Sequence, residues 1–525
     1  MKNIKGRQVV SRRSLIAAGG AAAAITQIPG FAFAQSATPE STLEPVRGGT
    51  LKIGVQGDPV GLDPALSILD AADIIFDFVY EGLTRLTPAI EAEPALAESW
   101  TISEDGLTYT FAIRQGVTFH NGRVLDASDI KYSFDRVIDP ATASPDVTHT
   151  ENISSIEVTD PATIVFTLKA PDASFLTRIS RPGLAAVPRE EVEKTGDLQL
   201  TMVGTGPFVF EEYTPNTSLT FSRNESYWDT GKPYVDALEV SIIPNDTSRT
   251  TALVSGTVDL IEAVPHADIE SVQGNSDLKL AGNRVTNLRW LVFNLRNEPF
   301  SNPAFREAVG KSLDRGAIID TAVFGYGDPL LGLYPAEFWA GYHGEIPAQD
   351  LDGATTALAG VTLPNEFKPK LLTWAAYQFL SSTSIVVQEQ LKQIGIESEI
   401  DAQENATYLE NFFSGNFDIA VMGAAGYIDP DEFLRSMLAT GEYTNASGYT
   451  NPAYDELLDE GLATQDSDAR AAIYQQAQQI VIDDLPIIPL YTSNTYEGLS
   501  VDVEGFEHSL SGRLGSIRST WLNRS

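Results

Sequence analysis

The length of the chain is the feature that most limits its fold. The chain has 525 residues, whereas a single hydrophobic core stops growing at roughly 250–300 residues. We therefore expect two or more domains or lobes. Hydrophobic residues make up 43% and charged residues 20% of the chain. This balance is typical of globular proteins and excludes a disordered or fibrous chain.

The charge balance restricts the partners of the protein. The chain has 71 Asp and Glu against 35 Lys and Arg, which gives a formal net charge of -36. Binding to nucleic acid depends on basic groups that neutralise phosphates, and binding to an anionic membrane surface depends on them too. Neither is expected as a partner. The excess of acidic residues is explained by the solubility that a high net charge gives to a protein.

The N-terminus has the pattern of an export signal. Its basic residues are followed by an apolar stretch over residues 15–28, and residues 32–34 (AFA) form an A-x-A cleavage site. Residues 11–16 (SRRSLI) resemble the twin-arginine export box, and a general secretory leader is the alternative. We predict a signal peptide over residues 1–34, cleaved after about Ala34.

The rest of the chain is predicted to be exported and soluble. Residues 35–48 are polar and read as a flexible lead-in. No stretch after the leader approaches the 18 apolar residues of a membrane helix. Cys is absent, which excludes a lipid-modified N-terminal cysteine, disulfides and thiolate metal sites. A free periplasmic protein is the simplest outcome.

Hydrophobic patterning indicates an α/β fold without strict βαβ alternation. A hairpin is predicted over residues 100–113, with its turn at residues 103–106. Asn302-Pro303 and Asn451-Pro452 each supply an N-cap and a proline at the first position of a helix. The other expected helices span residues 73–81, 247–255, 382–394 and 468–482, with one more after Asp126. The other expected strands span residues 50–55, 163–168, 238–243, 258–261, 290–294, 397–400 and 417–421, with two more within 204–223.

The sequence contains no motif for catalysis or for a cofactor. The five histidines are too scattered for a metal-binding pair: His120, His149, His266, His343 and His508. Nucleophile-elbow, P-loop and dinucleotide-binding patterns are missing, and residues 325–329 (GYGDP) read as a turn. We predict no catalytic residue, no metal site and no cofactor.

One stretch of about forty residues carries a family resemblance. Residues 97–137 (AESWTISEDGLTYTFAIRQGVTFHNGRVLDASDIKYSFDRV) resemble the signature of family 5 solute-binding proteins of ABC importers, the peptide/nickel class. Residues 204–208 (GTGPF), 224–228 (NESYW), 448–452 (GYTNP) and 485–490 (LPIIPL) also resemble that family. The likeness therefore runs over nearly all of the predicted mature chain.

The resemblance implies a type II periplasmic-binding-protein fold. Two α/β lobes joined by a hinge would close on a ligand, because contacts from both lobes exist only in the closed state. The closed form would deliver a small organic solute to an ABC permease in the inner membrane, with no covalent chemistry, and the protein is expected to be a monomer. The implied parts are residues 49–81, 201–285 and 495–525 for lobe 1, 82–200 for an inserted domain, and 286–494 for lobe 2.

The sequence departs from the pattern of peptide-binding members at one position. Such members carry an aspartate that pairs with the α-ammonium of the peptide, and Gly426 stands there. Glycine has no charge to offer a buried ammonium group, and an unpaired buried charge is costly. This weakens the ordinary peptide interpretation and favours a glycoside, an oligosaccharide, an opine-like conjugate or a blocked peptide. The alternative is that Asp429 binds an amine.

Loops at strand ends supply the predicted ligand contacts. Trp374 and Tyr427 are candidates to stack on a ligand, and Arg296 to hold a carboxylate. The alternative is that these residues have structural roles only. The side chain of Asn294 would then form hydrogen bonds with the backbone, Trp374 would pack in the hydrophobic core, and Asp429 would start a turn. The full set is Leu66, Ser67, Asn294, Arg296, Trp374, Tyr427 and Asp429.

Three alternatives to import of an organic solute remain open. The same fold could carry a chelated metal of the nickel type, with the chelator supplying the ligands. A secreted hydrolase is the hypothesis from another class, although no catalytic motif supports it. A sensor that presents its ligand to a receptor or chaperone is the third.

Overall fold

The computed structural model describes residues 43–67, 69–336 and 338–524. The predicted signal peptide over residues 1–34 lies outside the described residues, as does most of the lead-in over 35–48. Within the described part, no helix is both long and apolar enough to cross a bilayer.

Most strands of the described chain belong to one mixed sheet of twelve strands. Its members are β1 (Thr50–Val55), β8 (Phe208–Thr214), β9 (Ser218–Arg223), β10 (Ala237–Ile242), β11 (Leu260–Ile261), β12 (Leu278–Arg284), β13 (Leu288–Phe293), β14 (Gly327–Pro329), β15 (Lys370–Trp374), β16 (Glu399–Gln403), β17 (Ile419–Ala424) and β18 (Ile487–Ser500). The order across the sheet is β16-β15-β17-β13-β18-β11-β1-β10-β9-β8, and β12 and β14 also pair with β18.

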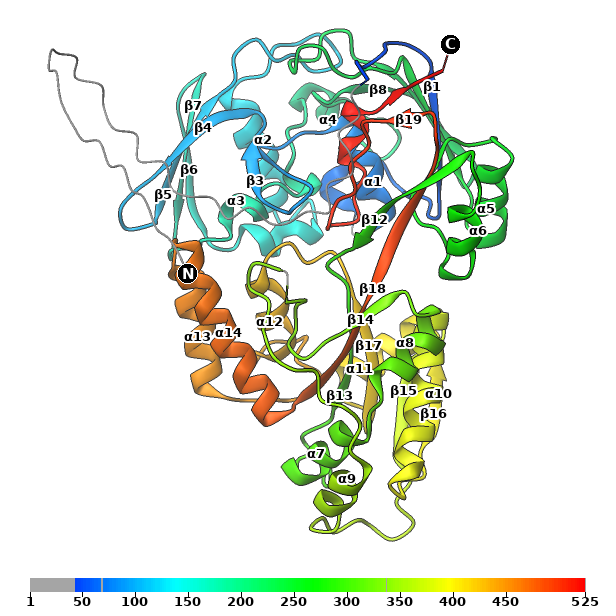
Figure 1. The fold of residues 1–525 in the computed structure, drawn as a ribbon. Coiled ribbons are helices and arrows are strands. Elements are labelled where there is room, and N and C mark those ends of the chain that lie inside the picture. The colour runs from blue at the N-terminus through cyan, green and yellow to red at the C-terminus, as the bar shows by residue number, and fades with distance from the viewer. Residues whose placement is uncertain (1–42, 68, 337, 525) are drawn as a thin grey trace, which may run out of the picture. The chain divides into compact units, whose positions relative to one another are not determined.

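Strand β18 connects two groups of strands. Its first residues, from Ile487 to Tyr491, pair with β13, whereas Gly498 and Leu499 near its end pair with β11. Figure 1 shows this long strand passing from one group to the other, with β12 alongside it. The chain crosses a second time between β12 and β13, at residues 285–287. Two adjacent crossings of this kind are suited to act as a hinge.

A separate sheet of four strands has its own hydrophobic core. Its order is β4-β5-β7-β6, with β4 (Ala97–Ile102), β5 (Thr108–Ile113), β6 (Ile153–Asp160) and β7 (Thr163–Leu168). Phe111 of β5 and Phe166 of β7 are fully buried, with ring centroids 5.7 Å apart, and Phe134 packs on Phe166 from helix α2 (Ala127–Ile138). The short pairs are β2 (Thr84–Leu86) with β3 (Ala92–Pro94), and β19 (Val503–Glu504) with β20 (Trp521–Leu522).

Helices cover both faces of the strands β13, β15 and β17. Leu291 and Val421 point to one cluster, which includes residues from helices between 303 and 393, whereas Trp290 and Met422 point to the other, which includes residues from helices between 405 and 484. The remaining helices are α1 (Asp70–Val79), α3 (Phe175–Arg178), α4 (Arg189–Thr195), α5 (Asp246–Val254), α6 (Ile269–Gln273), α7 (Pro303–Ser312), α8 (Arg315–Val323), α9 (Leu351–Leu358), α10 (Gln378–Gln393), α11 (Asn405–Phe413), α12 (Pro430–Leu438), α13 (Pro452–Ala463) and α14 (Ser467–Asp484). Five short 3-10 helices are η1 (Pro64–Leu66), η2 (Pro145–Thr150), η3 (Pro182–Leu184), η4 (His266–Asp268) and η5 (Gly515–Ser519).

Local sequence signals explain several element boundaries. The side chains of Asn302 and Asn451 cap α7 and α13, each followed by a proline in the first turn, as predicted. Asp126 caps α2 in a capping box with Asp129. The hairpin over residues 100–113 is confirmed by β4 and β5.

Some of the predicted element boundaries and one predicted turn were wrong. The helix predicted over residues 382–394 begins earlier, at Gln378, because the polar run over residues 381–384 hides the helical period that starts at Phe379 and Leu380. Residues 327–329, predicted as part of a turn, form β14 and pair with β18. The apolar run at residues 485–491 contains only the first five residues of β18, which begins at Ile487 and continues through Thr495 and Glu497.

From these packing units we propose a division of the chain into two lobes and an inserted domain. Lobe 1 comprises residues 49–81, 201–285 and 495–524. The inserted domain comprises residues 82–200 and contains the four-stranded sheet. Lobe 2 comprises residues 286–494.

Candidate ligand-binding cleft

A cavity of about 220 Å³ lies between the inserted domain and lobe 2. Polar side chains from both sides line it. They are Thr148, His149, Ser174, Thr177, Arg178 and Arg181 on the inserted domain, and Asp429, Asp431, Glu432, Arg435, Ser436 and Glu442 on lobe 2, with Ile428 the one apolar member. A cavity with walls on separate parts of the chain is the arrangement that hinge closure requires.

Direct contacts between side chains and between backbone groups join the inserted domain to lobe 2. The guanidinium of Arg181, which precedes η3, forms an ion pair with the carboxylate of Glu432 in the first turn of α12. Glu432 also accepts a hydrogen bond at 3.4 Å from the backbone of Ile428. In addition, the backbone amide of Ala173 in the inserted domain donates a hydrogen bond to the backbone carbonyl of Leu462 in lobe 2, at 2.8 Å.

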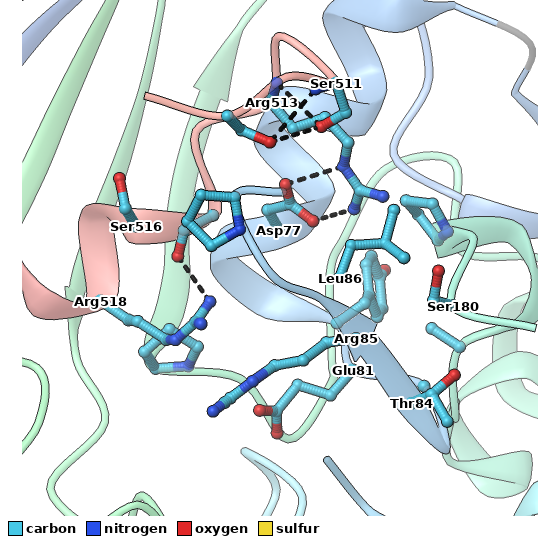
Figure 2. A pocket seen from close by; sticks show the side chains of 18 of the residues that line it. Asp77, Glu81, Thr84, Arg85, Leu86, Ser180, Ser511, Arg513, Ser516 and Arg518 are labelled. Atoms are coloured by element: carbon cyan, nitrogen blue, oxygen red, sulfur yellow. Dashed lines mark hydrogen bonds and ion pairs between the residues drawn. The ribbon is translucent and has the colours of Figure 1, made fainter. Parts of the chain in front are cut away.

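Figure 2 shows a second cavity, of about 110 Å³. Its walls come from α1, β2, η3 and the C-terminal residues 507–519. Arg513 holds the carboxylate of Asp77 with its Nε 2.9 Å from Oδ2. Ser180 lines this cavity and the neighbouring Arg181 lines the first one. The segment at residues 180–182 therefore separates the two.

Burial shifts the titration of three groups near this segment. It raises the pKa of Asp73 to about 6, with Asp77 and Asp146 adding to the rise and Arg513 opposing it. Burial also raises the pKa of Asp146 to about 6, against the charge of Arg181. Burial lowers the pKa of His149 to about 3, and Arg181 adds to that effect. His149 is therefore neutral at neutral pH.

Three of the predicted residues lie at one edge of the lobe 2 sheet. Trp374 ends β15, stacks on Tyr408 at 4.9 Å and donates to the Asn405 side chain at 2.6 Å. Tyr427 follows β17 and packs on a phenylalanine of α12. Asp429 lines the 220 Å³ cavity.

The carboxylate of Asp429 is already occupied by protein groups. It caps α12 by accepting from the Asp431 amide at 3.0 Å. It also forms a buried two-pronged ion pair with Arg470, at 2.7 and 2.8 Å. A ligand amine would have to compete with this arginine, so the structure gives no support to the amine-binding alternative.

The lobe 1 candidates lie at the end of η1. Leu66 is its last residue and Ser67 its C-cap, and both are half-buried. The hydroxyl of Ser67 accepts from the Leu69 amide at 3.3 Å. Neither residue lines the two cavities described above.

Asn294 and Arg296 lie at the opposite edge of the lobe 2 sheet. They follow β13, which is antiparallel to β17, so its end lies beside the start of β17. Asn294 is buried and donates to the carbonyls of Gly415 and Phe417 at 2.8 and 2.9 Å. Arg296 donates to the Ala446 carbonyl at 2.7 Å. The structure therefore separates these two residues from Trp374, Tyr427 and Asp429, and a ligand role for them remains an untested prediction.

Gly426 has a left-handed backbone with a φ of +81°. No heavy atom lies within 4 Å of the position that a Cβ would occupy. The site therefore has room for a side chain, and the missing aspartate is not a consequence of crowding.

Sequence reasoning did not identify Arg181, His149 or Glu432 as cleft residues. His149 lies in η2 and Arg181 directly precedes η3, and nothing in their local sequence indicates contact with lobe 2. Glu432 resembles an ordinary acid in the first turn of a helix. Among the residues described, no three His, Cys, Asp or Glu side chains gather as metal ligands.

Comparison with known proteins agrees with this architecture. The family model for bacterial extracellular solute-binding proteins, family 5, matches residues 91–445. Heme-binding protein A of Haemophilus influenzae is 30% identical over 487 residues, which cover 86% of this chain and 88% of that protein. The glutathione-binding protein GsiB of Salmonella paratyphi A is 28% identical over 462 residues, covering 85% and 89%.

A solved structure shows the same fold. The periplasmic binding protein AgaA of A. tumefaciens R10, in complex with agropinic acid, has a TM-score of 0.78 and 29% identity, covering 91% of this chain and 99% of AgaA. The predicted two-lobed α/β fold and the family are thereby confirmed. The chain belongs to the bacterial extracellular solute-binding proteins of family 5.

Proposed function

We propose that the protein captures a peptide-like or conjugated organic solute between its lobes and delivers it to an ABC permease. The observation that carries this proposal is the cavity between the inserted domain and lobe 2, bridged by Arg181 and Glu432. Residues from one side alone would leave a ligand exposed. A solute that touches both walls stabilises the closed state, which is the form that a permease recognises.

The polar lining favours a ligand with several hydrogen-bonding groups. Thr148 and Ser436 offer hydroxyls beside charged arginines and acids. Small-molecule sites usually combine such groups with apolar surface, which Tyr427 and Trp374 supply at the neighbouring sheet edge. Glutathione and agropinic acid, named for two similar proteins, have this mixed chemistry.

The proposal also covers the export, the location and the oligomeric state of the protein. We propose export through a signal peptide over residues 1–34, of the twin-arginine type, to the periplasm, and action as a monomer. Binding of an oligosaccharide or a chelated metal by the same fold is the alternative. The family and the similar proteins are binding proteins rather than enzymes, so hydrolysis has no observation in its favour.

A thermal-shift screen tests the proposal. Peptides, glutathione, sugar–amino acid conjugates, oligosaccharides and nickel chelates would each be added to the mature protein. A true ligand at 100 times its Kd stabilises the folded state by about 2.7 kcal/mol. Stabilisation by oligosaccharides or chelates alone would replace the proposed ligand class. Turnover of any compound in the screen, followed by mass spectrometry, would contradict a pure binding function.

A further inference from the structure

Arg289 is a buried arginine at the edge of the lobe 2 sheet where the candidate residues gather. It is the second residue of β13 and lies opposite Gly423 of β17. Its Nη1 donates to the carbonyls of Leu288 and Ala424, at 2.8 and 3.3 Å. Its guanidinium lies over the ring of Phe379, with Cζ 4.3 Å from the ring centroid. These contacts fix the position of the guanidinium without neutralising its charge.

The charge of Arg289 has no acidic partner among the described side chains. The residue is only 8% exposed, and its Nε is enclosed without a hydrogen-bond acceptor. Its Nη2 also makes no hydrogen bond to the described protein, but this atom is not enclosed. Burial lowers the pKa of Arg289, and the nearby hydroxyls of Tyr491 and Tyr377 offset only part of that effect. A buried unpaired charge is costly unless another group pairs with it.

Gly423 provides the space in which this arginine lies. A Cβ at position 423 would be 2.7 Å from Cδ and 3.0 Å from Nε of Arg289. Any side chain there would push the guanidinium away from the sheet edge. The glycine and the arginine therefore act as a pair that holds a positive charge at this edge.

The surroundings of Arg289 connect it to the cleft. β17, which carries Gly423, ends at Ala424, and the chain then runs past Gly426 to Asp429, which lines the 220 Å³ cavity. On the other side, the charge of Arg289 helps to lower the pKa of His266, which belongs to lobe 1. The guanidinium thus lies near the boundary between the lobes, beside the exposed Tyr377.

We propose that Arg289 binds a carboxylate of the transported solute, which makes the ligand an acidic organic molecule. This inference rests on the proposed function. A carboxylate approaching the sheet edge would accept a hydrogen bond from Nη2, the atom that is not enclosed, and its negative charge would offset the buried charge of the guanidinium. The acid could be the C-terminus of a peptide or the acid group of a sugar conjugate, and both present the same chemistry.

Arg315 provides a matched comparison. It is also 8% exposed, donates to the Pro489 carbonyl at 3.0 Å and has an enclosed Nη1 without a partner. Burial lowers its pKa to about 10. Arg315 starts α8, however, and packs beneath the sheet rather than at the edge that carries Trp374 and Tyr427. A general effect of losing a buried arginine would appear at both positions.

The test compares acids with their esters. N-acetyl dipeptides, glutathione and N-glycosyl amino acids are each titrated as the free acid and as the methyl ester, against the wild type, Arg289→Met, Arg289→Lys and Arg315→Met. We expect the wild type to bind at least one acid about 10- to 100-fold more tightly than its ester, the range of a charge-assisted pair. Arg289→Met should lose that preference, Arg289→Lys should keep part of it and Arg315→Met should keep all of it.

Each other outcome overturns the inference. If the esters bind the wild type as tightly as the acids do, Arg289 does not bind a carboxylate of the solute. Solute capture would still stand in that case. This comparison uses the wild type alone, so it does not depend on whether a variant folds. Equal loss in Arg289→Met and Arg315→Met shows a structural effect instead. If no compound binds in either form, the proposed ligand class fails, and the role of Arg289 fails with it. The dipeptide and glycosyl series separately identify which kind of acid is recognised.

Discussion

Arg181 of the inserted domain forms an ion pair with Glu432 of α12, although the two residues are 251 positions apart in the sequence. Both side chains line the cavity between the inserted domain and lobe 2. The pair exists only while these two parts of the chain are close together. It therefore favours the arrangement in which the inserted domain and lobe 2 are in contact.

Replacement of Glu432 by Gln should shift the protein toward its open form. Partly exposed ion pairs contribute up to about 1 kcal/mol, which corresponds to a change of up to about 5-fold in the closed fraction. Because the chain contains no Cys, cysteines at the exposed Val254 and Ile385 can carry a fluorophore pair for single-molecule energy transfer. The control is Glu193→Gln, which removes an exposed pair with Arg189 inside α4. An unchanged closed fraction in Glu432→Gln would contradict the role of the pair.

Replacement of Arg470 by Met should strongly destabilise lobe 2. Its partner Asp429 is buried, and loss of one member of a buried pair leaves an uncompensated charge, at a cost of about 3–5 kcal/mol. Urea unfolding measures this loss. Lys131→Met, which breaks an exposed pair with Asp135, should cost less than about 0.5 kcal/mol. Similar losses in both variants would show that Asp429 does not depend on Arg470.

Replacement of Gly426 by Asp tests the recognition of amines. The left-handed backbone should cost about 1 kcal/mol of stability, since Asp tolerates this conformation better than most residues do. The new carboxylate should increase the affinity for dipeptides with a free amino terminus, measured by calorimetry. Gly441→Asp is the matched control, because Gly441 has a φ of +86° and similarly open space. A gain in affinity in both variants, or in neither, would disprove the assigned position of Gly426.

Replacement of Asp73 by Asn should change the dependence of stability on pH. Burial raises the pKa of Asp73 from 3.8 to about 6 in the folded protein. The folded state therefore binds a proton more tightly than the unfolded state, and stability is lost as the pH rises through that interval. At pH 7.5 the variant should be more stable than the wild type by about 1 kcal/mol. This is less than the pKa shift alone implies, because Asp73 is half-buried and solvent screens part of its charge. At pH 3.5 the difference should vanish. A variant that is less stable at pH 7.5 would contradict the buried position.

Local signals in the sequence predicted the elements better than the site. Asn302 and Asn451 fixed the starts of α7 and α13 because an N-cap followed by proline depends on neighbouring residues alone. The length of β18 was missed, since Thr495 and Glu497 interrupt its apolar pattern and its pairing partners lie far away in the chain.

The choice between two arginines shows why the site was harder to predict. Arg296 was predicted to hold a carboxylate, and Arg289 was not considered, although Arg289 lies near the start of β13 and Arg296 follows the end of the same strand. The sequence does not show that β13 runs antiparallel to β17, and this direction decides which end of β13 faces the candidate residues. Only the fold reveals that Arg289 lies there with no acidic partner among the side chains that the structure describes.

Native mass spectrometry of the protein purified from its own host tests solute capture most directly. We expect one small organic molecule bound per chain, released on unfolding and carrying at least one carboxylate. The released molecule, added back to ligand-free protein, should close the labelled Val254–Ile385 pair. A chain that carries no solute, or a bound molecule that leaves the distance between the labels unchanged, would contradict capture between the lobes.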